Sequence, residues 1–149
     1  YTLEREGTRT PSDVDVTARE QRTREKITRL LTADARDPEP LPQRYSTVIS
    51  AYCADSATGD RATWETYMRH IGGLVRPGGL FVTAALRRST GYVVGGRTFP
   101  SANVDETDLE AVLARDFDDV TVSTRALAEH ESQGYSGIVL GVARRRTFS

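Results

Sequence analysis

The sequence predicts an α/β protein whose sheet is mostly parallel and ends in an antiparallel final strand. Apolar segments typical of buried strands alternate along the chain with segments whose apolar residues recur at helical spacing. The last two strand-like segments are the exception, because no helix stands between them. Strands separated by helices pair in parallel, whereas two strands joined without a long crossover pair antiparallel.

Composition and charge exclude several classes of protein. The chain has 20 basic and 21 acidic residues, and its net charge of −1 gives no long-range attraction for nucleic acid or an anionic membrane. No apolar run approaches the ~20 residues of a membrane helix. The single cysteine, Cys53, excludes an internal disulfide, and we expect it to be a small buried residue. Two histidines far apart favour no metal site, and the absence of a secretory signal favours the cytoplasm.

The first third of the chain is mostly polar. We expect an exposed helix over Asp13–Lys26, with its start marked by Pro11-Ser12. The short apolar run Ile27–Ala33 predicts a strand. Three prolines within residues 37–42 then exclude a helix or a central strand, so an extended connector is expected there.

The middle of the chain contains the clearest strand–helix–strand pattern. Ser46–Tyr52 is β-branched and uncharged, as in strands buried on both faces, and Leu80–Leu86 is a second such strand. Pro77-Gly78-Gly79 is expected to end the intervening helix and turn the chain. Apolar residues at helical spacing predict that this helix packs on the core: Trp64, Tyr67, Met68, Ile71, Leu74 and Val75.

The last third of the chain predicts a hairpin, a helix and two strands. Glycines interrupt the apolar run Tyr92–Phe99, which indicates a hairpin outside the main sheet. An acidic helix start follows at residues 105–108. Val120–Leu127 and Gly137–Ala143 are the two final strands, and a turn at Gly134–Ser136 precedes the second.

Two strings carry a resemblance to a known family. Residues 73–82 (GLVRPGGLFV) resemble the helix-to-strand junction of class I S-adenosylmethionine-dependent methyltransferases. Residues 50–55 (SAYCAD), just after the preceding strand, are similar to the nicotinamide, phenylethanolamine and indolethylamine N-methyltransferase family. The hairpin with Tyr92, Gly95 and Phe99 also resembles that family. The resemblance covers most of residues 30–143.

This resemblance implies a Rossmann-like class I methyltransferase sheet. Residues 1–149 are then expected to be the C-terminal part of a single catalytic domain. The family's N-terminal strands, the glycine-rich loop that cradles the methionine end of the cofactor and the acid that holds its ribose are missing from this sequence. We therefore expect half of a cofactor site.

The resemblance also implies which residues meet S-adenosylmethionine. Asp34 matches the acid that accepts a hydrogen bond from the adenine amino group, and Ala35 matches the residue whose N–H meets an adenine ring nitrogen. Ser50, Ala51 and Tyr52 match residues beside the cofactor and the methyl-transfer channel. A loop-capping role for Asp34 and ordinary packing for Tyr52 are the alternatives. No metal site is expected.

On the substrate side, the resemblance assigns Tyr52, Asp55 and Tyr92. Asp55 is also the candidate catalytic residue, which would orient the amine or accept its proton through water. The alternative for Asp55 is a helix cap or a surface position.

Relatives often carry a substrate-binding acid where this chain has Ala84-Ala85, and here Arg87 and Arg88 follow. The two arginines are either part of a solvated loop or a clamp for an anionic group of the substrate.

These assignments predict an enzyme that transfers a methyl group from S-adenosylmethionine to a nitrogen of a small molecule. If the two arginines bind the substrate, that small molecule also carries an anionic group. In-line displacement would be promoted by proximity and alignment. The expected partner is a small amine-type molecule. A second hypothesis is a non-catalytic, methyltransferase-like half that needs the missing segment or a partner chain. A dinucleotide-binding module is less favoured, because that fold ends in parallel strands.

Overall fold

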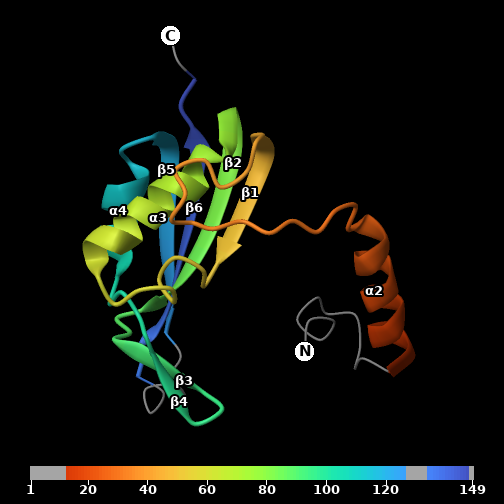
Figure 1. The fold of residues 1–149 in the computed structure, drawn as a ribbon, viewed down its shortest axis with the longest axis horizontal. Helices are drawn as coiled ribbons and strands as arrows, with labels where there is room; N and C mark the ends of the chain where they lie inside the picture. Colours follow the sequence, from red (N-terminus) through yellow and green to blue (C-terminus); the bar gives the residue numbers. More distant parts are fainter. Residues whose placement is uncertain (1–12, 127–133, 148–149) are drawn as a thin grey trace. The chain divides into compact units, whose positions relative to one another are not determined.

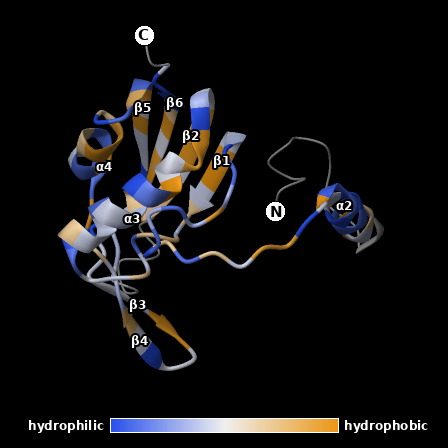
Figure 2. Ribbon diagram, turned by 45° about the horizontal axis from the view of Figure 1, so that its top comes forward, coloured by the Kyte–Doolittle hydropathy of each residue, from blue (hydrophilic) through white to orange (hydrophobic). Residues whose placement is uncertain are grey.

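A computed structural model of the chain describes residues 13–126 and 134–147 (Figure 1). These residues divide into two units, one up to Thr32 and one from Ala33 onward. The first unit contains helix α2, Asp13–Lys26, which is polar and largely exposed as predicted (Figure 2). Pro11 and Ser12, which were expected to mark its start, lie outside the described residues. No described helix has the length and apolar character needed to cross a membrane.

The second unit contains a four-stranded mixed sheet. Its order is β1 (Tyr45–Ala51), β2 (Val75–Arg87), β6 (Gly137–Arg145) and β5 (Phe117–Ala126). Strand β1 pairs in parallel with β2, and β6 pairs antiparallel with both β2 and β5. The α/β class and the antiparallel final strand are therefore confirmed. Leu127, which was expected to end β5, lies outside the described residues.

The predicted strand over Ile27–Ala33 is wrong. These residues have no regular secondary structure, and their apolar side chains are exposed: 53% for Ile27, 89% for Leu30 and 47% for Leu31. An extended segment becomes a stable strand only when a neighbour satisfies its backbone hydrogen bonds. No described strand pairs with this segment, so the sheet has one parallel and two antiparallel pairings.

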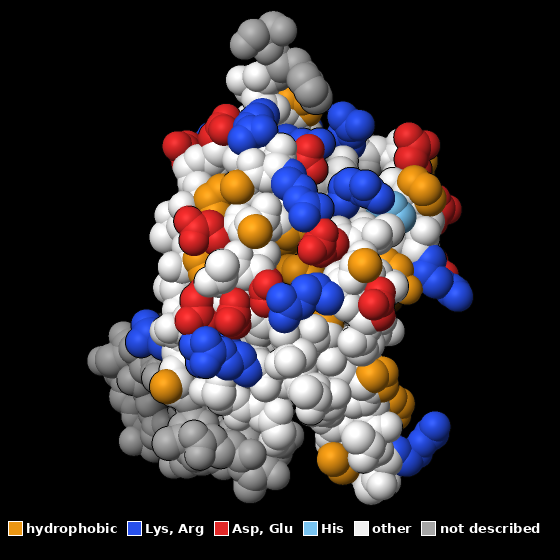
Figure 3. Space-filling view, turned by 90° about the vertical axis from the view of Figure 1, so that its left-hand side faces the viewer, with side chains coloured by type: hydrophobic (Ala, Val, Ile, Leu, Met, Phe, Trp, Pro, Cys, Tyr) orange, Lys and Arg blue, Asp and Glu red, His pale blue; other side chains and the backbone are white. Residues whose placement is uncertain are grey.

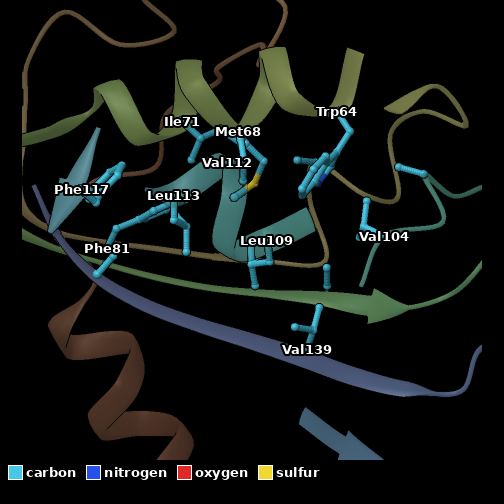
Figure 4. Close-up of a cluster of buried hydrophobic side chains, with 14 of the residues drawn as sticks. Trp64, Met68, Ile71, Phe81, Val104, Leu109, Val112, Leu113, Phe117 and Val139 are labelled. Atoms are coloured by element: carbon cyan, nitrogen blue, oxygen red, sulfur yellow. The ribbon is translucent and has the colours of Figure 1, made fainter. Parts of the chain in front are cut away.

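Helices α3 (Arg61–Gly73) and α4 (Glu106–Leu113) pack on one face of the sheet (Figures 1 and 4). Asp60 caps α3 by accepting a hydrogen bond from the Thr63 N–H at 2.7 Å. Asp105 caps α4, which confirms the predicted acidic helix start. Figure 4 shows the apolar side chains between these helices and the strands: Trp64, Met68, Ile71, Phe81, Val104, Leu109, Val112, Leu113, Phe117 and Val139.

The other face of the sheet exposes apolar side chains. Ile49 on β1 is 73% exposed and Val142 on β6 is 40% exposed. Strand β1 is also an edge strand of the described sheet. The prediction that β1 is buried on both faces therefore holds only for the helix-covered face.

Pro77-Gly78-Gly79 was expected to end the helix and turn the chain. The structure contradicts this, because these residues lie inside β2. Helix α3 ends at Gly73, capped by Leu74, and β2 already begins at Val75. Tyr45 pairs with Val75 whereas Thr47 pairs with Leu80, so the Pro-Gly-Gly residues form an irregularity in β2. A Cβ atom at Gly79 would lie 2.8 Å from the Ser46 carbonyl oxygen, which explains why glycine is needed at this close approach of strands.

The predicted hairpin is confirmed. Strands β3 (Gly91–Val94) and β4 (Arg97–Pro100) form a separate two-stranded sheet. Figure 1 shows this hairpin beyond the end of the main sheet toward which the β1 arrow points. The turn of the hairpin contains Gly95 and Gly96. Both have a positive φ, a backbone conformation that glycine adopts readily because it has no side chain.

Candidate active site

The end of β1 turns sharply at Tyr52. Its φ of 55° lies in the left-handed region, and its N–H donates to the Ala84 carbonyl of β2 at 2.8 Å. Ser50 is buried at 8% exposure, whereas Ala51 is exposed and Tyr52 is 41% exposed. Ala51 and Tyr52 are thus open to a ligand, and Ser50 supports them from the interior.

Asp55 is buried directly beyond this turn, with 1% exposure. Its Oδ2 accepts a hydrogen bond from the Leu86 N–H at 2.9 Å, and its backbone carbonyl accepts one from the Ala102 N–H at 3.0 Å. Burial raises the pKa of Asp55 above its ordinary value, while hydrogen bonds from Leu86, Ser56 and its own backbone act in the opposite direction. The carboxylate therefore joins the loop after β1 to the end of β2.

Arg87 is the last residue of β2, and all three nitrogens of its guanidinium donate hydrogen bonds. Nε and Nη2 donate to the two carboxylate oxygens of Glu106, each at 2.7 Å, and Nη1 donates to Ser136 Oγ at 3.1 Å. The Arg87 side chain is 20% exposed. Hydrogen bonding from Arg87 holds the pKa of Glu106 at about 2. This fork is typical of a strong Arg–carboxylate pair.

Arg88 has a much looser environment. Its φ of 52° is left-handed, and its N–H donates to the Val104 carbonyl at 2.8 Å. Its side chain is 56% exposed, and its guanidinium reaches Asp105 Oδ2 at 3.5 Å. Of the two predicted arginines, Arg88 is the one whose charged group is accessible.

Tyr92 connects the hairpin to the loop after β1. Its hydroxyl donates to the Ser56 carbonyl at 3.1 Å, and its ring stacks on Phe99 with a centroid separation of 5.4 Å. The structure therefore gathers most predicted site residues at one end of β1 and β2. We call this group the strand-end cluster: Ser50, Ala51, Tyr52, Asp55, Arg87, Arg88 and Tyr92.

Asp34 and Ala35 lie apart from the strand-end cluster. The Asp34 carboxylate accepts hydrogen bonds from Arg36 Nη2 at 2.6 Å and Arg36 Nε at 2.9 Å, and these bonds lower its pKa to about 2. The Ala35 carbonyl lies 2.8 Å from Nδ1 of His70, one turn before the end of α3. That end of α3 adjoins the start of β1, because the Tyr45 N–H donates to the Leu74 carbonyl.

Sequence reasoning missed three residues at the site. His70 anchors Ala35, and Glu106 and Ser136 engage Arg87. His70 immediately precedes Ile71 in the apolar stripe, and Glu106 is part of the predicted acidic helix start. No signal in the sequence paired these residues with partners far along the chain.

Three further observations concern Cys53, possible metal ligands and the location of a cavity. Cys53 is exposed, which contradicts its expected burial, because it lies on the surface loop that follows Tyr52. Within residues 13–126 and 134–147, no group of three His, Cys, Asp or Glu side chains could hold a metal ion. A cavity of about 200 Å³ lies between the proline-rich connector and the end of α3, away from the strand-end cluster.

The visible molecular surface in Figure 3 has interspersed basic and acidic side chains. Ion pairs among the described residues include Arg61 with Asp108 at 2.6 Å and Arg115 with Glu65 at 2.8 Å. This face therefore has no extended region of one charge sign.

Curated relatives are N-methyltransferases. Phenylethanolamine N-methyltransferase of Macaca mulatta is 27% identical over 103 residues, which cover 65% of this chain and 36% of that protein. Nicotinamide N-methyltransferase of Homo sapiens is 27% identical over 117 residues, which cover 76% of this chain and 43% of that protein. The matched part of this chain therefore spans less than half the length of these relatives.

Solved structures show that the fold is that of class I methyltransferases. N-methyltransferase NodS from Bradyrhizobium japonicum WM9, in complex with S-adenosyl-L-homocysteine, has a TM-score of 0.59 at 15% identity, covering 91% of this chain and 64% of that one. The 1,6-didemethyltoxoflavin-N1-methyltransferase of Burkholderia thailandensis has a TM-score of 0.58 at 17% identity, covering 92% and 59%. The CurJ carbon methyltransferase also reaches 0.58, so the fold alone does not distinguish nitrogen from carbon as the acceptor.

The family itself follows from a match along nearly the whole sequence. The model of the NNMT/PNMT/TEMT family matches residues 1–146, a range that includes both parts of the candidate site. This chain belongs to the NNMT/PNMT/TEMT family.

Proposed function

We propose that this chain contributes to an S-adenosylmethionine-dependent enzyme that methylates a nitrogen of a small molecule. The family match over residues 1–146 is the observation that carries this proposal. S-adenosylmethionine, when bound, supplies a methyl group activated by the sulfonium. Methyl transfer needs no enzyme nucleophile, so the protein's task is to bind, align and desolvate the reactants.

The cofactor side would be formed by Ala51, Tyr52 and the Asp34–Ala35 pair. Ala51 and Tyr52 are exposed at the end of β1, where an aromatic face and backbone carbonyls suit a sulfonium cation. Asp34 offers an exposed carboxylate to the adenine amino group, and the Ala35 N–H is the proposed donor to the adenine ring. Ala51 and Tyr52 thus suit the sulfonium end of the cofactor. Because Asp34 and Ala35 lie apart from them, beside the end of α3 that adjoins the start of β1, the proposal requires this segment to move toward the end of β1 when the cofactor binds. The bond between Asp34 and Arg36 would then be shared or released.

Asp55 is proposed to act chiefly by positioning. Its carboxylate is buried and holds the Leu86 N–H, so it fixes the loop that presents Tyr52. A positioning role predicts that Asp55→Asn, which keeps a hydrogen-bond acceptor, retains the fold and most of the methyl transfer. A role in orienting a cationic amine predicts that Asp55→Asn retains the fold but abolishes transfer to such amines.

For the substrate, we propose that Arg88 meets an anionic group. Arg87 binds Glu106 and Ser136, whereas the Arg88 side chain is 56% exposed and its guanidinium has only a long contact with Asp105. A carboxylate or phosphate near Arg88 could form a charge-assisted bidentate contact, with the amine directed toward the methyl group.

The test of Arg88 is a panel of amines with and without an anionic group. Arg88→Ala should lower kcat/KM for anionic amines by roughly tenfold to a hundredfold, with little change for neutral ones. Arg88→Lys should restore part of the loss. Arg76→Ala, which removes an exposed arginine near the other end of β2, is the matched control. Equal losses across the whole panel would remove the anionic substrate from the proposal.

The enzyme activity itself is tested with methyl-labelled S-adenosylmethionine and a set of small amines. The proposal predicts label on a substrate nitrogen and product inhibition by S-adenosylhomocysteine. Label transferred to carbon or oxygen only would contradict nitrogen as the acceptor.

A second candidate function is a non-catalytic half that needs a partner chain. Strand β1 favours this second function for two reasons. It is an edge strand of the described sheet, and an unpaired strand edge readily accepts another strand. It also exposes an apolar side chain, Ile49, on the face of the sheet that no described helix covers. Calorimetry with S-adenosylhomocysteine separates the two hypotheses. Binding by the purified 149-residue chain alone opposes the second, and binding only after a complementing chain is added supports it.

A further inference from the structure

Residues 34–37 form a compact turn held together by its own hydrogen bonds. The Asp37 N–H donates to the Asp34 carbonyl at 3.0 Å, and the Arg36 N–H donates to Asp34 Oδ1 at 3.0 Å. The Arg36 guanidinium also binds the same carboxylate. All these bonds join residues within the turn. The 34–37 turn can therefore change its position as one piece without losing them.

Contact with helix α3 holds this turn where it lies. Ala35 is the only one of residues 31–39, all of them described, that is not exposed, and it packs against the apolar core. Its carbonyl oxygen lies 2.8 Å from Nδ1 of His70, which is 35 residues further along the chain. A carbonyl oxygen only accepts hydrogen bonds, so Nδ1 of His70 carries the proton of this bond. His70 therefore joins the turn to the last part of α3.

The chain on either side of the turn holds it less firmly. Residues 27–34 have no regular secondary structure, and Leu30 among them is 89% exposed. On the other side, the cavity of about 200 Å³ separates the proline-rich connector from the end of α3, and His70 lines it. Atoms that face a void make few van der Waals contacts, so packing holds the connector weakly there. The hydrogen bond from His70 therefore matters more for the position of the turn than it would in a closely packed segment.

The position that His70 holds differs from the one that the proposed cofactor site requires. The turn lies beside the end of α3 that adjoins the start of β1, whereas Ala51 lies at the other end of β1. A strand of seven residues is roughly 23 Å long, and residues 35–44, which link the turn to β1, can span about 33 Å when extended. The turn can therefore reach the end of β1 while its connection to Tyr45 stays intact, but only if the bond to His70 breaks.

We propose that His70 holds the 34–37 turn against α3, and that this hold must be released for S-adenosylmethionine to bind. The inference rests on the proposed function, because it takes Asp34 and Ala35 as cofactor-binding residues. Cofactor binding must then supply the free energy that breaks the bond to His70. A protein whose binding-competent arrangement is only partly populated binds its ligand more weakly in proportion to that fraction. His70 is thus a positioning residue that weakens cofactor binding and makes the movement of the turn depend on the cofactor.

Three variants test this role. His70→Phe keeps an aromatic ring of similar size but removes the donor, and His70→Asn keeps a donor near the position of Nδ1. Arg69→Ala is the matched control, since Arg69 is the exposed neighbour of His70 in α3. Urea unfolding checks that each variant is folded, and His70→Ala replaces His70→Phe if the larger ring destabilises the chain.

The first measurement follows the position of the turn in the absence of any ligand. Cys53 is the single cysteine of the chain, and it is exposed on the loop that follows β1. A nitroxide label on Cys53 therefore broadens the NMR signals of amides that approach the end of β1, even when the approach is brief. We expect stronger broadening at Ala35 and Asp37 in His70→Phe than in the wild type, and wild-type broadening in the other two variants.

The second measurement is the Kd for S-adenosylhomocysteine, determined by calorimetry on the unlabelled chain. His70→Phe should bind roughly three- to tenfold more tightly than the wild type, which is the range expected when one hydrogen bond no longer has to be broken. His70→Asn and Arg69→Ala should bind as the wild type does. The direction of the change is specific to release, because removing a residue that supports a binding site weakens binding.

The outcomes separate this inference from the proposed function. Unchanged broadening in His70→Phe overturns the inference whether or not the chain binds the cofactor. Stronger broadening with weaker binding also overturns it, because His70 then supports the binding position of the turn. Stronger broadening with an unchanged Kd overturns release by the cofactor and removes Asp34 and Ala35 from the site. Stronger broadening in a chain that binds no S-adenosylhomocysteine supports the hold on the turn and counts against the proposed cofactor site.

Discussion

The strand-end cluster and the Asp34–Ala35 pair differ in where their hydrogen-bonding partners come from. In the cluster, Asp55 binds Leu86, Arg87 binds Glu106 and Tyr92 binds Ser56, so long-range contacts within the chain fix these side chains. Asp34 is exposed and its carboxylate binds Arg36, only two residues away. Contacts within the chain therefore determine the geometry of the cluster, whereas Asp34 is left open to a ligand.

This difference has a functional meaning. In the function proposed above, a site that aligns reactants needs side chains held in place beforehand, and a buried, hydrogen-bonded group such as Asp55 would meet that need. A group that recognises a ligand has to be accessible instead. We therefore expect substitutions in the cluster to affect folding and catalysis together, and substitutions at Asp34 to affect cofactor binding alone.

The largest expected effect is on the stability of the fold in Asp55→Ala. The substitution leaves the buried Leu86 N–H without its acceptor, which should lower the free energy of unfolding by about 1–3 kcal/mol. Asp55→Asn should lose less, because it keeps an acceptor. Urea unfolding of both variants gives the measurement, and equal stability of Asp55→Ala and the wild type would contradict a structural role for Asp55.

The next effect concerns cofactor binding in Asp34→Ala. Loss of the proposed acceptor for the adenine amino group should weaken S-adenosylhomocysteine binding by roughly tenfold, with no change in the unfolding midpoint. Asp37→Ala is the matched control, since Asp37 belongs to the same turn and accepts a hydrogen bond from the Glu39 N–H. Calorimetry that finds the same Kd for Asp34→Ala and Asp37→Ala would remove Asp34 from the site.

A smaller effect is expected on the pH dependence of stability. The pKa of Glu106 is about 2 in the folded state, against an ordinary value of 4.5, because Arg87 favours the ionised carboxylate. Its contribution is therefore present above about pH 4.5 and is lost as the pH falls toward 2. Thermal unfolding should show a shallower loss of stability on acidification in Glu106→Gln than in the wild type. Parallel curves would mean that the bond to Arg87 contributes nothing to stability.

The smallest effect is expected on the uncovered face of the sheet. Ile49 is 73% exposed, so Ile49→Thr should change the free energy of unfolding by no more than about 0.5 kcal/mol. Val139→Thr, on the buried face, places a hydroxyl among apolar side chains and should be clearly destabilising. A large loss of stability in Ile49→Thr would show that this face is covered in solution.

The sequence was informative where local chemistry decides the structure. The exposed helix over Asp13–Lys26, the hairpin around Gly95, the acidic start of α4 and the antiparallel final pair were all predicted. Each depends on neighbouring residues or on the length of a connection, and these features are visible in a single sequence. The family resemblance, carried by residues 50–55 and 73–82, was confirmed by the family match.

The sequence was misleading where a distant partner decides the structure. Ile27–Ala33 has the composition of a strand, but it lacks a described neighbour to pair with. Arg87 and Arg88 looked equivalent as neighbouring arginines, yet only Arg87 meets Glu106 and Ser136, which lie 19 and 49 residues along the chain. Pairings of this kind follow from the tertiary fold and carry no local pattern.

Backbone NMR with S-adenosylhomocysteine tests the central claim most directly. If the proposed residues form one cofactor site, titration should shift the amide signals of Ala35, Ala51 and Tyr52 together, with a single Kd. Signals of strand β5 at the far edge of the sheet, such as that of Thr121, should stay unchanged. Shifts confined to the proline-rich connector, or no shifts anywhere at millimolar ligand, would contradict a cofactor site formed by this chain at the end of β1.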